Sequence, residues 1–356
     1  QQTTGPVMAK ALEDTAFYRY NRLIALNEVG GEPDRFGAPL EDFHASMAQR
    51  LRRQSAGLSA TSTHDTKRGE DARARLYSLS EMPEAWAAAV RRWTLLNADF
   101  RTSSDDQAMP EPEVEWLFYQ ALAGAWPADL AWDDAAGLTA LADRMAQFML
   151  KAVREAKTHT NWTAQNAEYE AAVEGFTRAA LDPARAKPFL QNFVAMCGPV
   201  FLAGVLNSLS QTAIKLTAPG VPDIYQGSEL WELSLVDPDN RRPVDYDRCR
   251  ALQQTIADMA PDALLADWRS GALKMKLLHA GLALRAGGQD LFGEGTYLPL
   301  HVEGAAAENV VAYARLSSRR AVLTVVPRTP LHLLSGESLP LVPRDRWGDT
   351  AVSLPP

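Results

Sequence analysis

Apolar side chains recur every three or four residues through the middle third of the chain. One set comprises Trp86, Val90, Trp93, Leu96 and Phe100, and a second comprises Leu141, Met145, Phe148, Met149 and Ala152. This spacing places the members of each set on one face of a helix. The pattern predicts two amphipathic helices and a further helix near 113–122. Pro-, Gly- and Asp-rich breaks are expected near 108–112 and 126–134.

The longest apolar run, residues 193–206, is shorter than the roughly 18 residues that a membrane-spanning helix needs. Gly198 and Pro199 interrupt it, so the run is interpreted as a core segment. Further along, the apolar stretch 213–216 predicts a short strand that leads into a Pro/Gly turn and a polar loop. A helix near 248–259 is expected to follow, with Asp247 as its N-cap.

Beyond about residue 290 the chain consists of short runs of β-forming residues. The runs 296–303, 309–316 and 321–327 are separated by turn residues and predict a small all-β domain. Residues 1–70 instead mix short apolar stretches with dense polar motifs. That texture is typical of the loops at the strand ends of an enzyme.

Charge and cysteine content narrow the class of protein. The chain has 36 Lys and Arg against 44 Asp and Glu, for a net charge of −8, and the charges are interspersed. We therefore expect a soluble protein with no nucleic-acid partner and no membrane partner. The two cysteines, Cys197 and Cys249, exclude a disulfide scaffold and favour a cytoplasmic location. The six scattered histidines indicate no metal site, and no cofactor is expected.

Two polar clusters are candidates for chemistry. His64 and Asp65 place an imidazole beside a carboxylate, and Lys67 adds a cation two residues later. An isolated His-Asp pair is common, and the alternatives are a solvated loop or Asp65 as the cap of the following helix. The second cluster is Asp223, Tyr225 and Glu229, in a stretch whose Pro and Gly residues by themselves indicate only a turn.

Long stretches around both clusters resemble the maltooligosyltrehalose synthases of the α-amylase superfamily. The matches are MAKALEDTAFYRYNRLIALNEVGGEPDRFG at 8–37, TSTHDTKRGEDARARL at 61–76, KAVREAKTHTNWTAQNAEYE at 151–170 and PGVPDIYQGSELWELSLVDPDNRRPVDY at 219–246. The departures from the family pattern, at Ala11, 160–161 and 164–165, affect no charged site residue.

The fold that this resemblance implies is α/β with an all-α insertion and a small all-β domain. Residues 1–75 would form C-terminal strands and helices of a (β/α)8 barrel, and 76–190 a large helical insert. Residues 191–285 would supply the last barrel strand with its helices, and 286–356 a C-terminal β-sandwich. In this superfamily the two polar clusters follow the seventh and eighth barrel strands, so both are expected at the C-terminal face of the barrel.

The implied activity is an intramolecular transglycosylation of a maltooligosaccharide substrate. The α-1,4 bond at the reducing end becomes an α,α-1,1 bond, with retention through a nucleophilic and an acid/base carboxylate. Asp65 matches the third carboxylate of the family, which stabilises the transition state. The expected substrate-binding residues are His64, Lys67, Lys10, Glu13, Tyr18 and Arg19, and the expected supporting residues are Asp223, Tyr225, Glu229, Arg241 and Arg242.

The roles assigned to single residues depend on the family resemblance. Without it, Lys10 is better explained as a surface lysine that pairs with Glu13 and Asp14. Arg19 can equally be the structural partner of a carboxylate. Arg241 and Arg242 are expected to organise their own loop through ion pairs.

In the superfamily the nucleophile and general acid follow the fourth and fifth strands, whereas this chain is expected to begin near the sixth. We therefore predict that the isolated chain is inactive and that it self-associates through exposed barrel surface. Two alternatives stay open. One is an α-glucan hydrolase of the same superfamily. The other is a non-catalytic glucan-binding module with Trp86, Trp93, Trp116 and Trp126 as platforms, although helical spacing makes the first two core residues.

Overall fold

The computed structural model describes residues 3–104 and 107–354, and the chain divides into two compact units. The first unit comprises 1–36, 64–200 and 233–242, and the second comprises 37–63, 201–232 and 243–356. Each unit is therefore assembled from three separate stretches of sequence. The four consecutive domains expected from the sequence remain a prediction.

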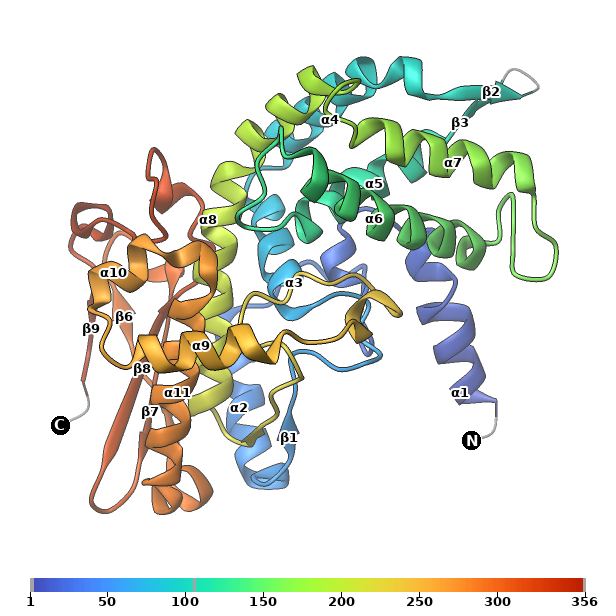
Figure 1. Cartoon of the computed structure of the whole chain (residues 1–356). Helices are drawn as coiled ribbons and strands as arrows, with labels where there is room; N and C mark the ends of the chain where they lie inside the picture. Colours follow the sequence, from blue (N-terminus) through green and yellow to red (C-terminus); the bar gives the residue numbers. More distant parts are fainter. Residues whose placement is uncertain (1–2, 105–106, 355–356) are drawn as a thin grey trace. The chain divides into compact units, whose positions relative to one another are not determined.

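Helices form most of the first unit, as the apolar periodicity predicts (Figure 1). The main ones are α3 (Glu70–Tyr77), α4 (Pro83–Leu96), α5 (Pro112–Ala125), α6 (Ala135–Ala156) and α7 (Ala167–Ala180). Before them come α1 (Thr4–Pro6), the π-helix Val7–Glu13 and two 3-10 turns, Ala16–Tyr18 and Ile24–Leu26. A small hairpin, β2 (Thr102–Ser104) with β3 (Gln107–Met109), precedes α5, in a region where the sequence predicts only a break.

Aromatic side chains form the centre of the first unit. Trp93 is fully buried and meets the Trp86 ring edge-on at 5.3 Å. Phe193, in the helix Lys187–Thr217, packs against Trp93, and the indole N–H of Trp93 donates to Asn192 of the same helix. Trp126 is also buried, in ring contact with Phe193. These three tryptophans are core residues, so they are not surface platforms for a glucan.

The sequence prediction is wrong for the long helix α8 (Lys187–Thr217). Pro199 lies inside the helix and does not end it, and the predicted strand 213–216 is its last turn. A short apolar run looks the same in a buried helix and in a buried strand, which explains the error. By length and composition α8 could cross a membrane, but core helices of soluble proteins pass the same test, and 56% of its most apolar window is buried within the protein.

The second unit combines helices with small sheets. Its helices are α2 (Leu40–Gln54), α9 (Tyr246–Ile256), α10 (Pro261–Ala266) and α11 (Ala272–Ala286). β5 (Thr296–Pro299), β7 (Val310–Leu316) and β8 (Ala321–Pro327) form an antiparallel sheet, and β6 (Val302–Glu303) pairs with β9 (Ala351–Val352). The predicted β runs are thus confirmed. A complete β-sandwich stays a prediction.

The N-cap of α9 differs from the prediction. The Asp245 side chain accepts a hydrogen bond from the backbone N–H of Arg248 at 2.9 Å, whereas Asp247 lies inside the first turn. Two aspartates lie two residues apart at the start of this helix. The sequence alone does not decide between them, because either can cap an orphan N–H group.

One arginine holds the second unit together at the sheet. Arg315 on β7 is fully buried, and burial lowers the pKa of its guanidinium. It donates to the backbone carbonyls of Thr217, Leu291, Phe292, Gly295 and Thr296, at 3.0–3.4 Å. The charge therefore fixes the end of α8 and the turn before β5 to the sheet without any carboxylate partner among these contacts.

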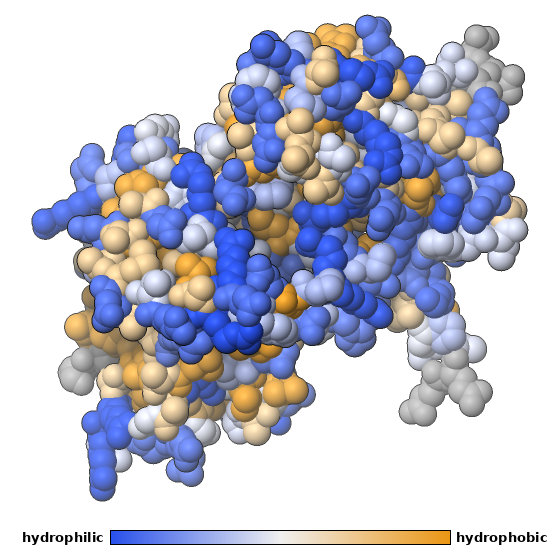
Figure 2. Space-filling view, viewed as in Figure 1, coloured by the Kyte–Doolittle hydropathy of each residue, from blue (hydrophilic) through white to orange (hydrophobic). Residues whose placement is uncertain are grey.

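Apolar side chains also reach the surface of the second unit. Leu323 and Val325 on β8 are 45% and 51% exposed, and Leu282 and Leu284 on α11 are similarly open. Figure 2 shows orange patches over this part of the molecule. The self-association expected from the sequence remains a prediction.

Candidate active site

The two polar clusters follow two strands that pair in parallel. β1 (Leu58–Ser59) pairs with β4 (Val221–Pro222), with Leu58 opposite Val221. Parallel neighbours end at the same edge of a sheet. In sequence, β1 precedes the motif at 64–67 and β4 precedes the motif at 223–229. The barrel arrangement expected for these strands remains a prediction.

His64 and Asp65 are exposed at the start of the first unit's second stretch. The amide of Asn240 donates to the His64 carbonyl at 3.1 Å and holds the backbone there. The helix that follows, α3, has Gly69 at its N-cap and no side-chain cap. The alternative in which Asp65 caps this helix is therefore wrong.

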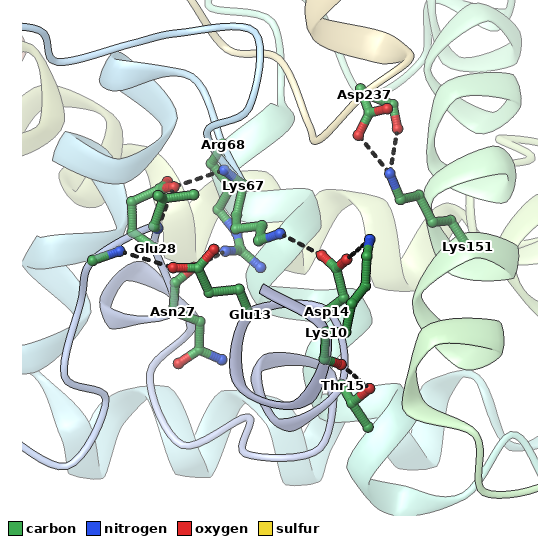
Figure 3. A network of polar contacts seen from close by, with 12 residues as sticks. Lys10, Glu13, Asp14, Thr15, Asn27, Glu28, Lys67, Arg68, Lys151 and Asp237 are labelled. Carbon is green, nitrogen blue, oxygen red and sulfur yellow. Dashed lines mark hydrogen bonds and ion pairs between the residues drawn. The ribbon is translucent and has the colours of Figure 1, made fainter. Parts of the chain in front are cut away.

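Lys67 is held at both ends. Its backbone N–H donates to Glu28 Oε1 at 2.8 Å, and its Nζ donates to Asp14 Oδ1 at 3.0 Å. Glu28 is itself fixed by Arg73, whose Nη1 lies 2.7 Å from Glu28 Oε2. The Lys67 side chain is only 7% exposed, so its position is set by these contacts rather than by solvent (Figure 3).

Lys10 reaches the same carboxylate from the π-helix Val7–Glu13. Its Nζ lies 2.5 Å from Asp14 Oδ2, the oxygen that Lys67 does not use (Figure 3). Lys10, Asp14 and Lys67 are called the Asp14 cluster below. The structure therefore brings together two lysines that the sequence assigned to the same ligand. Asp14, which the sequence offered only as an ordinary pairing partner, lies between them.

The electrostatics of the cluster follow from these contacts. Burial acts to raise the pKa of Asp14, but the hydrogen bonds and positive charges of the two lysines outweigh it and lower the pKa. The hydrogen bond to Asp14 raises the pKa of Lys10, and the charge of Asp65 adds to this effect. The raised pKa keeps the Lys10 amine charged at neutral pH, and Asp65 is near enough to act on it.

An open pocket of about 400 Å³ adjoins the cluster, lined by Pro6, Val7, Lys10, Ala11, Thr15 and Lys157. Thr15 links two of these residues. Its hydroxyl donates to the Lys10 carbonyl at 2.8 Å and accepts from Lys157 Nζ at 3.0 Å. The backbone of Lys10 is thus tied down while its 77% exposed side chain faces solvent.

The other expected substrate-binding residues contact the polypeptide. Glu13 Oε1 accepts the N–H of Gly30 at 3.2 Å. Tyr18 is buried, and burial raises the pKa of its hydroxyl well above the usual range. Among the residues that the structure describes, Arg19 donates to the carbonyls of Ala156 and Lys157 at the end of α6 and not to a carboxylate. Their roles toward a ligand stay predictions.

The loop 233–242 is fastened to α6 by ion pairs. Arg144 binds both oxygens of Asp239 at 2.9 Å, and Lys151 lies 2.5 Å from Asp237 Oδ1. Arg242 also contacts Asp239, at 2.9 Å, and Arg241 lies 3.7 Å from Asp237. Neither Arg144 nor Lys151 was predicted from the sequence. Their seven-residue spacing, which puts both on one face of a helix, was the available signal.

Asp223, Tyr225 and Glu229 belong to the second unit, where they follow β4. The Asp223 N–H donates to the Ser59 carbonyl at 3.0 Å and extends the pairing with β1. The Tyr225 carbonyl accepts the hydroxyl of Ser228 at 2.6 Å. These contacts build a tight loop at the strand end, and the structure groups the three residues with β1 and β4.

The described residues contain no group of three or more His, Cys, Asp and Glu side chains that could hold a metal ion.

Known proteins define the class to which this chain is related. No family model matches it. A putative maltooligosyl trehalose synthase from Mycobacterium tuberculosis is 36% identical over 355 residues, which is all of this chain and 40% of that protein. The solved maltooligosyltrehalose synthase of Arthrobacter ramosus is 34% identical, with a TM-score of 0.78 over 99% of this chain and 41% of its own. A hypothetical maltooligosyl trehalose synthase from Sulfolobus tokodaii is 31% identical, with a TM-score of 0.74 over 90% of this chain and 40% of its own.

The chain is therefore related to amylase-type enzymes. More narrowly, it is related along its whole length to the maltooligosyltrehalose synthases, and it spans about 40% of the length of the curated relatives that it matches.

Proposed function

We propose that this chain supplies one wall of the active site of a maltooligosyltrehalose synthase. The observation that carries the proposal is the Asp14 cluster, in which Lys10 and Lys67 meet at one carboxylate from two separate segments. The exposed His64–Asp65 pair ends two residues before Lys67. Cations and hydroxyl-binding groups in one place suit a neutral, hydroxyl-rich ligand such as a glucose unit.

The proposed reaction moves one glucose. The bond between C1 of the penultimate glucosyl unit and O4 of the reducing-end glucose breaks, and O4 takes a proton from a general acid while C1 bonds to a carboxylate nucleophile. The released glucose turns, and its C1 hydroxyl attacks the bound glucosyl C1. The hydroxyl proton passes to the same acid/base group and the nucleophile leaves as carboxylate. An α,α-1,1 bond results, with no net addition of water.

Within this scheme Asp65 accepts hydrogen bonds that strengthen as positive charge develops on the sugar ring, so it acts on the transition state. His64 donates to neighbouring hydroxyls of that sugar. Lys10 and Lys67 hold the released glucose in the site. If the glucose left before it reacted, water would attack the intermediate in its place. Asp223, Tyr225 and Glu229 support the loop at the end of β4.

We also propose that β1 and β4 are neighbouring strands of a (β/α)8 barrel. Their parallel pairing supports this arrangement, as do the polar motifs that follow each strand. Active sites of such barrels lie at the carboxyl ends of the strands. Because the chain spans about 40% of its relatives, we propose that it binds maltooligosaccharides but does not convert them by itself.

The test uses the full-length protein that contains this chain and maltopentaose as substrate. We expect the wild type to form non-reducing trehalosyl ends, and Asp65→Asn to lower kcat by about 10²-fold or more, as the loss of a transition-state contact does. Wild-type turnover in Asp65→Asn would refute the role of Asp65. Hydrolysis without any trehalosyl ends in the wild type would instead favour an α-glucan hydrolase.

The isolated chain provides an independent test. Calorimetry with maltopentaose should detect binding, and product analysis should detect no conversion. Addition of the remaining part of the enzyme as a separate polypeptide should restore activity. Conversion by the chain alone would contradict the proposal, and binding with no restoration would favour a non-catalytic module.

A further inference from the structure

Asp14 is the residue at which the two lysines of the cluster meet. Each of its carboxylate oxygens accepts from one amine: Oδ1 from Lys67 at 3.0 Å and Oδ2 from Lys10 at 2.5 Å (Figure 3). Without the negative charge between them, two ammonium groups this close would repel each other. The carboxylate therefore sets how far apart the two amines lie.

The backbones of the two lysines are anchored separately. Glu28 holds the N–H of Lys67, while Thr15 holds the carbonyl of Lys10. The exposure of the side chains differs sharply, at 7% for Lys67 and 77% for Lys10. Lys67 is thus largely buried, whereas the Lys10 side chain faces solvent. Asp14 ties the exposed amine to the buried one.

We propose that Asp14 is a positioning residue that aligns the Lys10 and Lys67 amines on the leaving glucose, and that it thereby sets the share of glycosyl transfer that goes to glucose rather than to water. The inference rests on the proposed function and goes beyond it, because it assigns control of the product ratio to a residue that does not touch the reacting atoms.

The physical reason is a competition for one intermediate. The glucosyl unit on the nucleophile is attacked at C1 either by the C1 hydroxyl of the retained glucose or by water, and in both cases the attacking oxygen gives its proton to the base and the carboxylate leaves. Water needs no orientation, whereas glucose must be held with one hydroxyl aimed at C1. Loss of alignment therefore slows transfer to glucose and leaves attack by water unchanged.

The experiment measures this ratio in the full-length protein. Asp14→Asn keeps the size of the side chain but removes its charge. With maltopentaose we expect its ratio of released glucose to trehalosyl ends to rise by roughly three- to tenfold, because small misplacements of a reactant have large effects on rate. The ratio is taken per bond broken, so a smaller amount of folded enzyme does not change it.

Asp14→Glu restores the carboxylate and should return the ratio most of the way to the wild-type value. The matched control is Asp143→Asn, which removes a carboxylate that pairs with Arg178 at 2.6 Å on the exposed side of α6. It should leave the ratio unchanged. Should Asp14→Asn fail to fold, Lys10→Met carries the test, because Lys10 is mostly exposed and its loss should raise the ratio in the same direction.

Two results would overturn the inference. One is an unchanged ratio in Asp14→Asn, or in Lys10→Met where that variant is used, while total bond cleavage falls, since this is what a purely structural role predicts. The other is an equal rise in Asp143→Asn. Failure of the proposed function is a different result, in which the wild type itself forms no trehalosyl ends.

Discussion

Two regions of the molecule use positive charge in opposite ways. Arg315 in the second unit is buried, and within residues 3–104 and 107–354 its hydrogen bonds all go to backbone carbonyls. Lys10 and Lys67 in the first unit share the single carboxylate of Asp14. A planar guanidinium enclosed by fixed carbonyls is part of the scaffold. An ammonium group has three N–H donors, so lysines that share one carboxylate can also donate to the hydroxyls of a ligand.

The largest expected effect is the loss of stability on substitution of Arg315. Arg315→Met fills much of the same space but leaves several buried carbonyls without a donor, so we expect the free energy of unfolding to fall by about 3 kcal/mol or more. Urea denaturation of the chain measures this. Arg319→Met, at an exposed position on the same hairpin, is the control and should change stability by less than about 0.5 kcal/mol. Equal midpoints for the two variants would remove the distinction between the regions.

Substitution of Lys10 or Lys67 should affect the stability of the protein to different extents but should change the product ratio in the same direction. Lys67→Met removes a buried partner of Asp14, and we expect a loss of about 1–2 kcal/mol. Lys10→Met removes an exposed ion pair, and the loss should stay below about 0.5 kcal/mol. Both variants should raise the ratio of released glucose to trehalosyl ends, called the hydrolysis ratio below, in the full-length enzyme. If only Lys67→Met does so, Lys10 does not contact the glucose.

The sequence predicted the elements whose signal is local. Trp86 and Trp93 mark one face of α4, and the β runs near the end of the chain form β5, β7 and β8 of the second unit. It failed at α8, where Gly198, Pro199 and an apolar stretch gave no periodicity to separate helix from strand. The division into two discontinuous units also has no local signal, because it depends on contacts between distant segments.

The candidate site was predicted in part. His64, Asp65, Lys67 and Lys10 came from the family resemblance, and the structure brings the two lysines together on Asp14. The role of Asp14 as their common partner could not be read from the sequence, since a lysine four residues before an aspartate on a helix is an ordinary surface pair. The convergence of Lys67 on the same residue is a tertiary contact.

Arg19 can be tested against both groups of cations, those that bind backbone carbonyls and those expected to bind the glucose. The sequence placed it with the substrate-binding residues, yet its Nε donates to the Ala156 carbonyl at 2.5 Å, at the end of α6. A cation at a helix C-terminus contributes about 0.3–1 kcal/mol, so Arg19→Met should lower stability by that amount. We expect its hydrolysis ratio to match the wild type. Arg91→Met, exposed on α4, is the stability control, and a raised ratio in Arg19→Met would return Arg19 to the glucose site.

The smallest expected effect is a difference in how the stability deficits of variants in the two regions depend on pH. The lysines lower the pKa of Asp14 below its ordinary value of 3.8, so its contribution to stability is present above that pH and is lost as the pH falls through the folded-state value. The deficit of Asp14→Asn relative to the wild type should be full above about pH 5 and shrink toward zero in acid. The deficit of Arg315→Met should stay constant over the same range, because neither an arginine nor a carbonyl titrates there. Denaturation midpoints of the three proteins from neutral to acid pH measure both deficits. Parallel curves for the two variants would mean that the charge of Asp14 does not hold the cluster together.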